Sequence, residues 1–132
     1  MSGKNETRQQ TAQWLKQNYP DRLIAVGDCG LIPFVYGGLV LDIFGLNSLK
    51  FTHQFGKNRN DYINYLMRQN PDFFLIVSKS THKLDPVYPS EKKITALPEF
   101  ISNYVLEKKF LNKKERYHYF VYRKQGKKIQ KV

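Results

Sequence analysis

Short apolar runs that stop at glycine or aspartate recur through the first part of the chain. Residues 23–26 and 39–41 each lead into an aspartate, and a third run, residues 73–77, follows an Asn-Pro pair. Apolar runs with such boundaries are typical of buried strands. The pattern predicts three strands, and the helical segments between them indicate parallel neighbours in one sheet.

Other segments carry the spacing of amphipathic helices. The expected helices are residues 5–19, 30–36, 60–69 and a single turn at 99–103. The first ends at Pro20, because the residue before a proline disfavours the helical region. The third shows an apolar stripe that stops at Asn70. Residues 47–59 and 78–97 lack either periodicity, so we interpret them as loops.

The C-terminal part predicts a hairpin. Residues 104–111 and 117–124 flank a polar turn, and side chains in the second segment alternate as in a strand. The element order therefore predicts an α/β fold: a small three-layer-like domain with a mostly parallel sheet and a C-terminal antiparallel hairpin. We expect one domain over residues 1–124, and a basic tail over 125–132 that frays.

Positive charge is concentrated in that hairpin. The net charge is +11, and the last 26 residues hold ten Lys or Arg against two Glu, or +8. A basic end favours a polyanion, either the anionic face of a bilayer or nucleic acid. The residues expected to contact an anionic surface are Lys108, Lys109, Lys113, Lys114, Arg116, Arg123 and Lys124.

Aromatic side chains alternate with basic ones along residues 117–124. Tyr117, Tyr119 and Tyr122 are therefore candidates for stacking on the bases of a single strand. The alternative interpretation is a strand with one face in the core and a solvated lysine rim.

The aspartates after the first two predicted strands suggest a ligand site. If the strands are parallel, Asp28 and Asp42 lie at the carboxyl edge of the sheet, where α/β proteins bind ligands. Either residue has a structural alternative, Asp28 as a helix cap and Asp42 as a turn residue. Gly30, Tyr36 and His53 complete the candidate ligand-binding set.

The remaining reactive side chains carry no recognisable chemistry. Asp42 and His53 do not have the spacing of a metal-ligand set, so we expect neither a metal nor another cofactor. Cys29 has no placed base and is interpreted as a small buried residue. His82 and His118 are expected at the surface. No catalytic residue is assigned.

The run GDCGLIPFVYGGLVLDIFGLNS, residues 27–48, carries a family resemblance together with the segments around it. The matching residues are Trp14, Leu15, Asn18, Pro20, Gly27, Asp28, Gly30, Ile32, Gly37 or Gly38, Asp42, Gly45, Leu46, Tyr65, Leu66, Asn70, Pro71, Asp72 and Phe73. Over residues 11–77 the chain resembles the soluble C-terminal region of bacterial membrane glycosyltransferases of the GT-C type. Those enzymes use polyprenyl-phosphate sugars, and their catalytic aspartate lies in the membrane part, which this sequence lacks.

The resemblance implies a non-catalytic domain of the cell envelope that engages an acceptor glycan, or a polyprenyl-linked acceptor, at the membrane surface. We expect no transferase or hydrolase activity from the isolated chain. Its expected location is the extracytoplasmic face of the membrane if it belongs to a larger membrane protein, and soluble, in the cytoplasm, if it is complete. Trp14 is read as a sugar-stacking residue or as a cover of the sheet. The alternative function is a free-standing module that binds nucleic acid.

Overall fold

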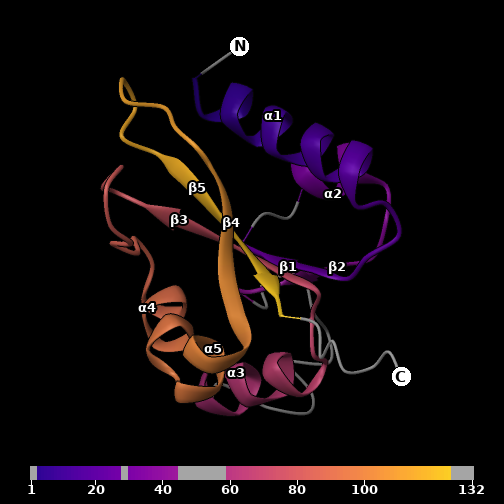
Figure 1. The fold of residues 1–132 in the computed structure, drawn as a ribbon, viewed down its shortest axis with the longest axis vertical. Helices are drawn as coiled ribbons and strands as arrows, with labels where there is room; N and C mark the ends of the chain where they lie inside the picture. The colour runs from indigo at the N-terminus through magenta and orange to yellow at the C-terminus, as the bar shows by residue number, and fades with distance from the viewer. Residues whose placement is uncertain (1–2, 28–29, 45–58, 126–132) are drawn as a thin grey trace.

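The computed structural model describes residues 3–27, 30–44 and 59–125. The elements are α1 (Gly3–Asn18), β1 (Ile24–Val26), α2 (Leu31–Tyr36), β2 (Val40–Asp42), α3 (Arg59–Arg68), β3 (Phe73–Ser78), α4 (Pro89–Ala96), α5 (Pro98–Asn103), β4 (Tyr104–Phe110) and β5 (His118–Lys124). Helices and strands alternate along these residues as far as β3, and two helices and then two strands follow (Figure 1).

The five described strands form one mixed sheet in the order β2-β1-β3-β5-β4. β1 is parallel to both β2 and β3, which confirms the predicted parallel arrangement of these three strands. β5 is antiparallel to β3 and to β4. Each parallel pairing aligns three residue pairs and each antiparallel pairing six, so the expectation of a mostly parallel sheet holds for one half only. The reason is that β5 inserts between β3 and β4 and pairs six of its seven residues with each of them.

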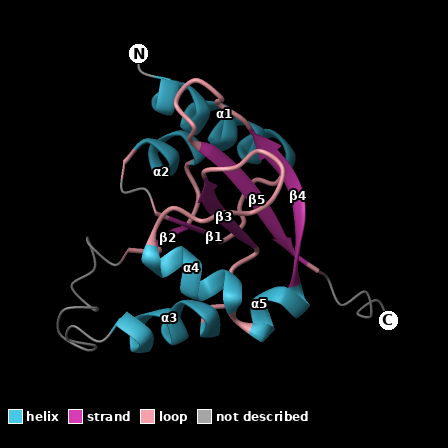
Figure 2. Ribbon diagram, turned by 90° about the vertical axis from the view of Figure 1, so that its left-hand side faces the viewer, coloured by secondary structure: helices cyan, strands magenta, loops and turns pink. Residues whose placement is uncertain are grey.

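Helices cover both faces of the sheet (Figure 2). Helices α1 and α2 lie on one face, where Leu15 and Ile32 pack against Leu75 of β3. Helices α3, α4 and α5 lie on the other face, where Leu66 packs in a cluster with Phe74. All six residues of β3 are buried, as expected of a strand that is covered on both faces.

Helix α4 lies within a segment that was predicted to be a loop. Pro89 occupies the first turn of this helix, where the missing N–H of proline does no harm. Pro86 and Pro89 are typical of loops as well as of helix starts, and the buried stripe of Glu91 and Ile94 is too sparse to show an amphipathic period. Among the described residues, no helix has the length and apolar character that crossing a membrane requires.

The path of the chain determines where along the sheet a ligand is expected to bind. From β1 the chain passes through α2 on one face to β2, and from β2 through α3 on the other face to β3. The connection that leaves β1 thus runs to β2 on one side, whereas the connection that leaves β3 runs through α4 and α5 to β4 on the other side, so the carboxyl ends of β1 and β3 form a topological switch point. Open α/β sheets bind ligands at such points. We call the edge where β1, β2 and β3 end the carboxyl edge, and the opposite one the amino edge.

Candidate functional site

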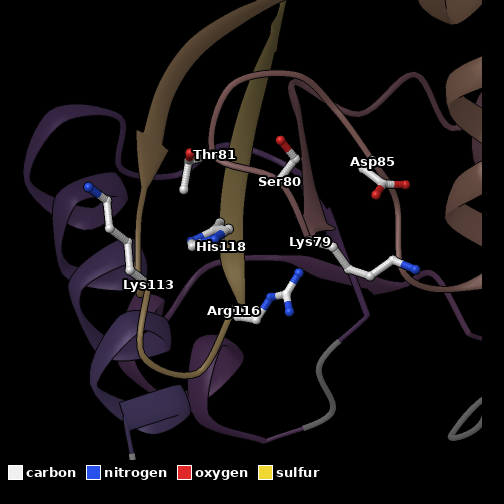
Figure 3. A pocket seen from close by; sticks show the side chains of 7 residues that line it. All are labelled: Lys79, Ser80, Thr81, Asp85, Lys113, Arg116 and His118. Atoms are coloured by element: carbon white, nitrogen blue, oxygen red, sulfur yellow. The ribbon is translucent and has the colours of Figure 1, made fainter.

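A polar pocket lies at the carboxyl edge, where β3 ends and β5 begins. Its volume is about 520 Å³. We call it the basic pocket; it is lined by Lys79, Ser80, Thr81, Asp85, Lys113, Arg116 and His118 (Figure 3). Because β5 is antiparallel to β3, its first residue pairs with the last residue of β3, Ser78. The loop after β3 and the turn before β5 are thereby brought to face one another.

The buried hydroxyl of Ser78 organises the loop after β3. Its oxygen accepts hydrogen bonds from the backbone N–H groups of Asp85 at 3.0 Å and Ser80 at 3.3 Å, and the hydroxyl donates to the Ser80 carbonyl at 2.9 Å. From β4, the Lys109 ammonium donates to the carbonyl of Thr81 at 2.8 Å. The loop is therefore fixed by the protein's own contacts.

Asn112 organises the turn before β5. Its side-chain oxygen accepts from the N–H of Glu115 at 3.1 Å, and its amide nitrogen donates to the Thr7 hydroxyl at 3.1 Å. At the end of this turn Arg116 has a φ of 54°, in the left-handed region. That conformation costs a side chain such as arginine about 1–2 kcal/mol. In Figure 3 the Arg116 guanidinium lies between His118 and Lys79.

His118 presents an N–H donor to the pocket. It is only 2% exposed, and its Nδ1 accepts a hydrogen bond from the Asn112 backbone N–H at 2.9 Å. A backbone N–H can only donate, so Nδ1 carries no proton and the neutral ring has its proton on Nε2. Burial and the positive charges of Arg116 and Lys113 lower the pKa of His118, which keeps the ring neutral at physiological pH.

The pocket carries excess positive charge without internal partners. Lys79, Lys113 and Arg116 stand against Asp85, which is three positive charges against one negative charge, or +2. Within residues 3–27, 30–44 and 59–125, none of the three cationic side chains makes a hydrogen bond or ion pair with the protein. Cations in this state attract an anion from solution.

The residues predicted as ligand contacts do not meet in this pocket. The Asp42 carboxylate accepts a hydrogen bond from the Phe44 backbone N–H at 3.0 Å, as expected if Asp42 is a turn residue. The Tyr36 hydroxyl is held by two backbone groups between α1 and β1, at 2.6 and 2.8 Å, and only 3% of the residue is exposed, so Tyr36 is a core residue. Gly30 precedes α2 and is exposed. Asp28 and His53 lie outside the described residues, as does Cys29.

The predicted basic surface is divided between two ends of the hairpin. Lys113 and Arg116 line the basic pocket, and Lys114 is exposed in the same turn. Arg123 and Lys124 lie at the far end of β5, beside a second pocket of about 320 Å³. Six residues of extended strand separate His118 from Lys124, which corresponds to about 20 Å.

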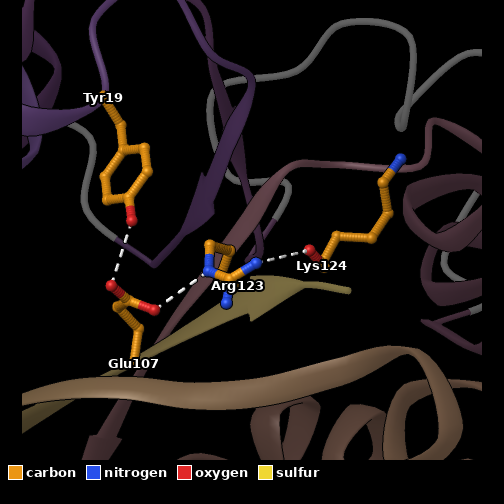
Figure 4. A network of polar contacts seen from close by, with 4 residues as sticks. All are labelled: Tyr19, Glu107, Arg123 and Lys124. Carbon is orange, nitrogen blue, oxygen red and sulfur yellow. Dashed lines mark hydrogen bonds and ion pairs between the residues drawn. The ribbon is translucent and has the colours of Figure 1, made fainter. Parts of the chain in front are cut away.

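The cations at the amino edge are engaged within the protein (Figure 4). Arg123 donates from Nε to one oxygen of Glu107 at 2.9 Å, and the Tyr19 hydroxyl donates to the other at 3.0 Å. The hydrogen bond from Arg123 holds the pKa of Glu107 below its usual range. Lys124 donates to the Asn70 carbonyl at 3.4 Å. We call this group, Tyr19, Glu107, Arg123 and Lys124, the Glu107 network.

The aromatic residues of β5 are turned into the protein. Tyr117 is 6% exposed, Tyr119 is fully buried, and Tyr122 packs its ring against Phe100 at 5.2 Å. They are therefore not placed for stacking on bases. The ring of Trp14 likewise packs against the ring of Phe110, with 5.9 Å between the ring centroids. This contact is expected if Trp14 covers the sheet.

The Lys108 ammonium lies 5.5 Å from the centroid of the Phe110 ring, so Lys108 also contacts a group of the protein.

His82 is exposed, as expected. The surface position predicted for His118 is wrong, because His118 pairs with Ser78 of β3 and its ring accepts a hydrogen bond from the turn before β5. An available signal was missed: the polar run SKST follows the predicted strand at 73–77, just as Asp28 and Asp42 follow the first two.

A buried carboxyl group lies behind the carboxyl edge. Glu91 of α4 is fully buried, and one of its oxygens accepts from the Val77 N–H at 3.3 Å. Its other oxygen has no hydrogen-bond partner among the described residues. Burial raises the pKa of Glu91 to about 8. In the described chain no three His, Cys, Asp or Glu side chains are grouped in a way that could hold a metal ion.

Comparison with known proteins gives one match. The sequence model of a family described as a domain of unknown function (DUF8728) matches residues 2–122. No curated protein and no solved structure matches the chain.

Proposed function

We propose, from the premise that the chain belongs to the DUF8728 family of domains of unknown function, that it is a non-catalytic binding domain. It engages the acceptor glycan of a membrane glycosyltransferase of the GT-C type at the membrane surface. The single observation that carries the binding role is the basic pocket, which lies at the switch-point edge and is lined by hydrogen-bonding side chains. The resemblance over residues 11–77 supplies the class of ligand.

The protonation of His118 supports binding rather than catalysis. A nucleophilic hydroxyl such as that of Ser80 needs a neighbouring base to take its proton. In the pocket, Nδ1 of His118 is occupied by the Asn112 N–H, and Nε2 carries the proton. The ring therefore acts as a hydrogen-bond donor toward a bound molecule.

The lining is suited to sugar hydroxyl groups beside an acidic group. Thr81 can donate or accept, the Ser80 hydroxyl can donate, and the Asp85 carboxylate accepts from hydroxyls. Since both loops are held by Ser78 and Asn112, little ordering is needed when a ligand binds.

The anionic membrane surface is the second partner that we propose. Exposed cations outside the pocket, such as Lys114, contribute roughly 1 kcal/mol each near an anionic bilayer. Nucleic acid remains the alternative partner, but of the stacking residues that favoured it, Tyr117 and Tyr119 lie in the core and Tyr122 is partly buried.

Binding of oligosaccharides to the purified chain tests the proposed function. A glycan array of neutral and acidic bacterial oligosaccharides would identify ligands, and calorimetry would give their affinities. We expect at least one ligand whose affinity falls about tenfold in a Ser80→Ala/Thr81→Ala variant, because each lost hydroxyl leaves a ligand group unpaired. Ser102→Ala removes an exposed hydroxyl in α5 and serves as the matched control.

The same protein sample can be used to decide between an anionic membrane surface and nucleic acid as the partner. Vesicles with anionic lipid and single-stranded oligonucleotides are compared at physiological salt, since both attract the same charges. Tighter binding to the oligonucleotide than to vesicles, or an array without any glycan ligand, would contradict the proposed function.

A further inference from the structure

Three cationic side chains line the basic pocket, and none has an ion-pair or hydrogen-bond partner among the described residues. Elsewhere in the hairpin, Arg123 is paired with Glu107, and Lys109 donates to two backbone carbonyls. We propose that the basic pocket is a binding site for a phosphate group, carried as a phosphate monoester by the ligand. The identity of that ligand as a glycan rests on the proposed function; the recognition of phosphate rests on the pocket alone.

The charge of the pocket matches that of a phosphate monoester. Lys79, Lys113 and Arg116 against Asp85 leave +2, and a phosphate monoester carries about −1.5 to −2 at pH 7. A planar, bidentate guanidinium and two lysine point charges are the side chains that proteins use most for this group. A singly charged carboxylate or phosphodiester would leave positive charge uncompensated.

The neutral side chains of the pocket add further donors. His118 offers its Nε2 proton, because Nδ1 already accepts a hydrogen bond. The Ser80 oxygen accepts two backbone N–H groups, at 3.2 and 3.5 Å, and among the described residues no acceptor takes its proton. That proton and the one on Thr81 remain for a ligand oxygen. A phosphate dianion has only acceptors, so it suits a lining rich in donors.

The donors come from two segments on different sides of the pocket. Ser80 and Thr81 come from the loop after β3, whereas Lys113, Arg116 and His118 come from the turn and strand across from it (Figure 3). A tetrahedral group presents oxygens in several directions, whereas a carboxylate presents two in a plane. Asp85 lies across the pocket from Lys113 in this view, where it can accept from a hydroxyl next to the phosphate.

The backbone of Arg116 supports a functional role for its side chain. Positive φ is rare for residues other than glycine, asparagine and aspartate, and it persists where the surrounding structure enforces it. Here the Asn112 carbonyl accepts from the Tyr117 N–H at 3.3 Å and closes the turn around Arg116. The backbone of Arg116 is thereby held at the pocket before any ligand arrives.

Calorimetric titration of the full chain with four probes tests this site: inorganic phosphate, glucose 1-phosphate, glucose and glucuronate, at constant ionic strength. We expect both phosphates to bind at least tenfold more tightly than glucose and glucuronate. A Lys113→Ala/Arg116→Ala variant should lose at least tenfold in affinity for both phosphates. Lys16→Ala/Arg68→Ala removes the same charges at exposed positions on α1 and α3 and should leave the affinity unchanged.

The outcomes separate this inference from the proposed function. Equal binding of glucose 1-phosphate and glucuronate, or equal losses in the two double variants, would overturn the phosphate site. Oligosaccharides that bind at the pocket irrespective of phosphate would also overturn it while leaving the glycan role intact. Phosphate binding without any glycan ligand would support the site and remove the proposed function. Because the pocket turn can also affect folding, Arg116→Lys, which keeps the charge but loses the guanidinium fork, provides a second variant; we expect it to weaken phosphate binding less than Arg116→Ala does.

Discussion

Basic side chains lie near both ends of β5, but only those at one end have partners among the described residues. At the amino edge, Arg123 is paired with Glu107, which also accepts from Tyr19, so its charge is balanced inside the protein (Figure 4). At the carboxyl edge, Lys113 and Arg116 face a pocket without any partner among the described residues (Figure 3). Sequence charge alone does not distinguish them. The difference indicates that the first group serves the fold and the second serves a ligand.

A third ionisable group, Glu91, is buried away from solvent. One of its oxygens has no hydrogen-bond partner among the described residues, and its pKa of about 8 means that it is held as the protonated acid. The folded state binds this proton more tightly than the unfolded chain, in which the pKa of Glu91 is near 4.5. The stabilisation is therefore complete below about pH 4.5, declines as pH rises toward 8, and is lost above it.

The largest expected effect is accordingly on the pH dependence of unfolding. Urea unfolding between these pH values should show a loss of a few kcal/mol, since one proton changes the free energy by at most about 1.4 kcal/mol per pH unit. Glu91→Gln keeps the shape of the side chain and should flatten this part of the profile. If the profiles of the two proteins have the same slope, Glu91 is not the group that titrates.

Removal of the side chain that builds the pocket turn has the next largest effect. Asn112→Ala loses two hydrogen bonds, to the Glu115 N–H and to Thr7, and should destabilise the protein by about 1–2 kcal/mol in thermal or urea unfolding. Phosphate affinity should fall as well, because Arg116 and His118 depend on this turn. Asn60→Ala, which removes one exposed hydrogen bond to Lys93, is the control and should change stability much less. Equal effects of the two substitutions would show that the turn is not held by Asn112.

Arg116→Gly should move stability and binding in opposite directions. Glycine adopts a positive φ without the steric cost of a side chain, so the variant should be more stable by roughly 0.5–1 kcal/mol. Its affinity for inorganic phosphate should nevertheless fall about tenfold. The control is Asn70→Gly at φ 57°, where asparagine already tolerates the conformation and the gain should be smaller. A variant that is destabilised would argue against strain at Arg116.

The smallest effect is expected in the Glu107 network. Glu107→Gln weakens a half-exposed ion pair, so unfolding should change by about 0.2–1 kcal/mol, and less at high salt. The pKa of Tyr19, which the hydrogen bond to Glu107 raises, should move back toward its ordinary value. Phosphate affinity at the basic pocket should stay the same. A marked change in that affinity would mean that the two ends of β5 are coupled.

Local sequence patterns were sufficient for the three parallel strands. The runs at 23–26 and 73–77 correspond to the buried strands β1 and β3, where apolar composition directly reflects burial. The run at 39–41 corresponds to β2, which lies at the end of the sheet and is only partly buried. The position of β5 between β3 and β4 was not predictable in this way, since strand order depends on contacts far apart in sequence. Helix α4 was missed because Pro89 begins a helix as readily as it belongs to a loop.

The candidate site was predictable only in part. Charge identified Lys113 and Arg116, but their convergence with Lys79 and His118 depends on the antiparallel pairing of β3 with β5. The expectation that ligands bind where parallel strands end drew attention to Asp28 and Asp42. The same expectation, applied to the third strand, would have included Ser80 and Thr81. The protonation state of His118 follows from a backbone hydrogen bond that no sequence pattern reveals.

Mapping inorganic phosphate onto the chain by two-dimensional NMR tests the central claim most directly. A ¹⁵N-labelled sample is titrated with phosphate at constant ionic strength, and the shift of each backbone amide is followed. The account predicts saturable shifts concentrated in residues 79–85 and 112–118, with residues 19–23 and 123–125 unaffected. Shifts of equal size at the two ends of β5, or spread without saturation over all basic residues, would contradict it.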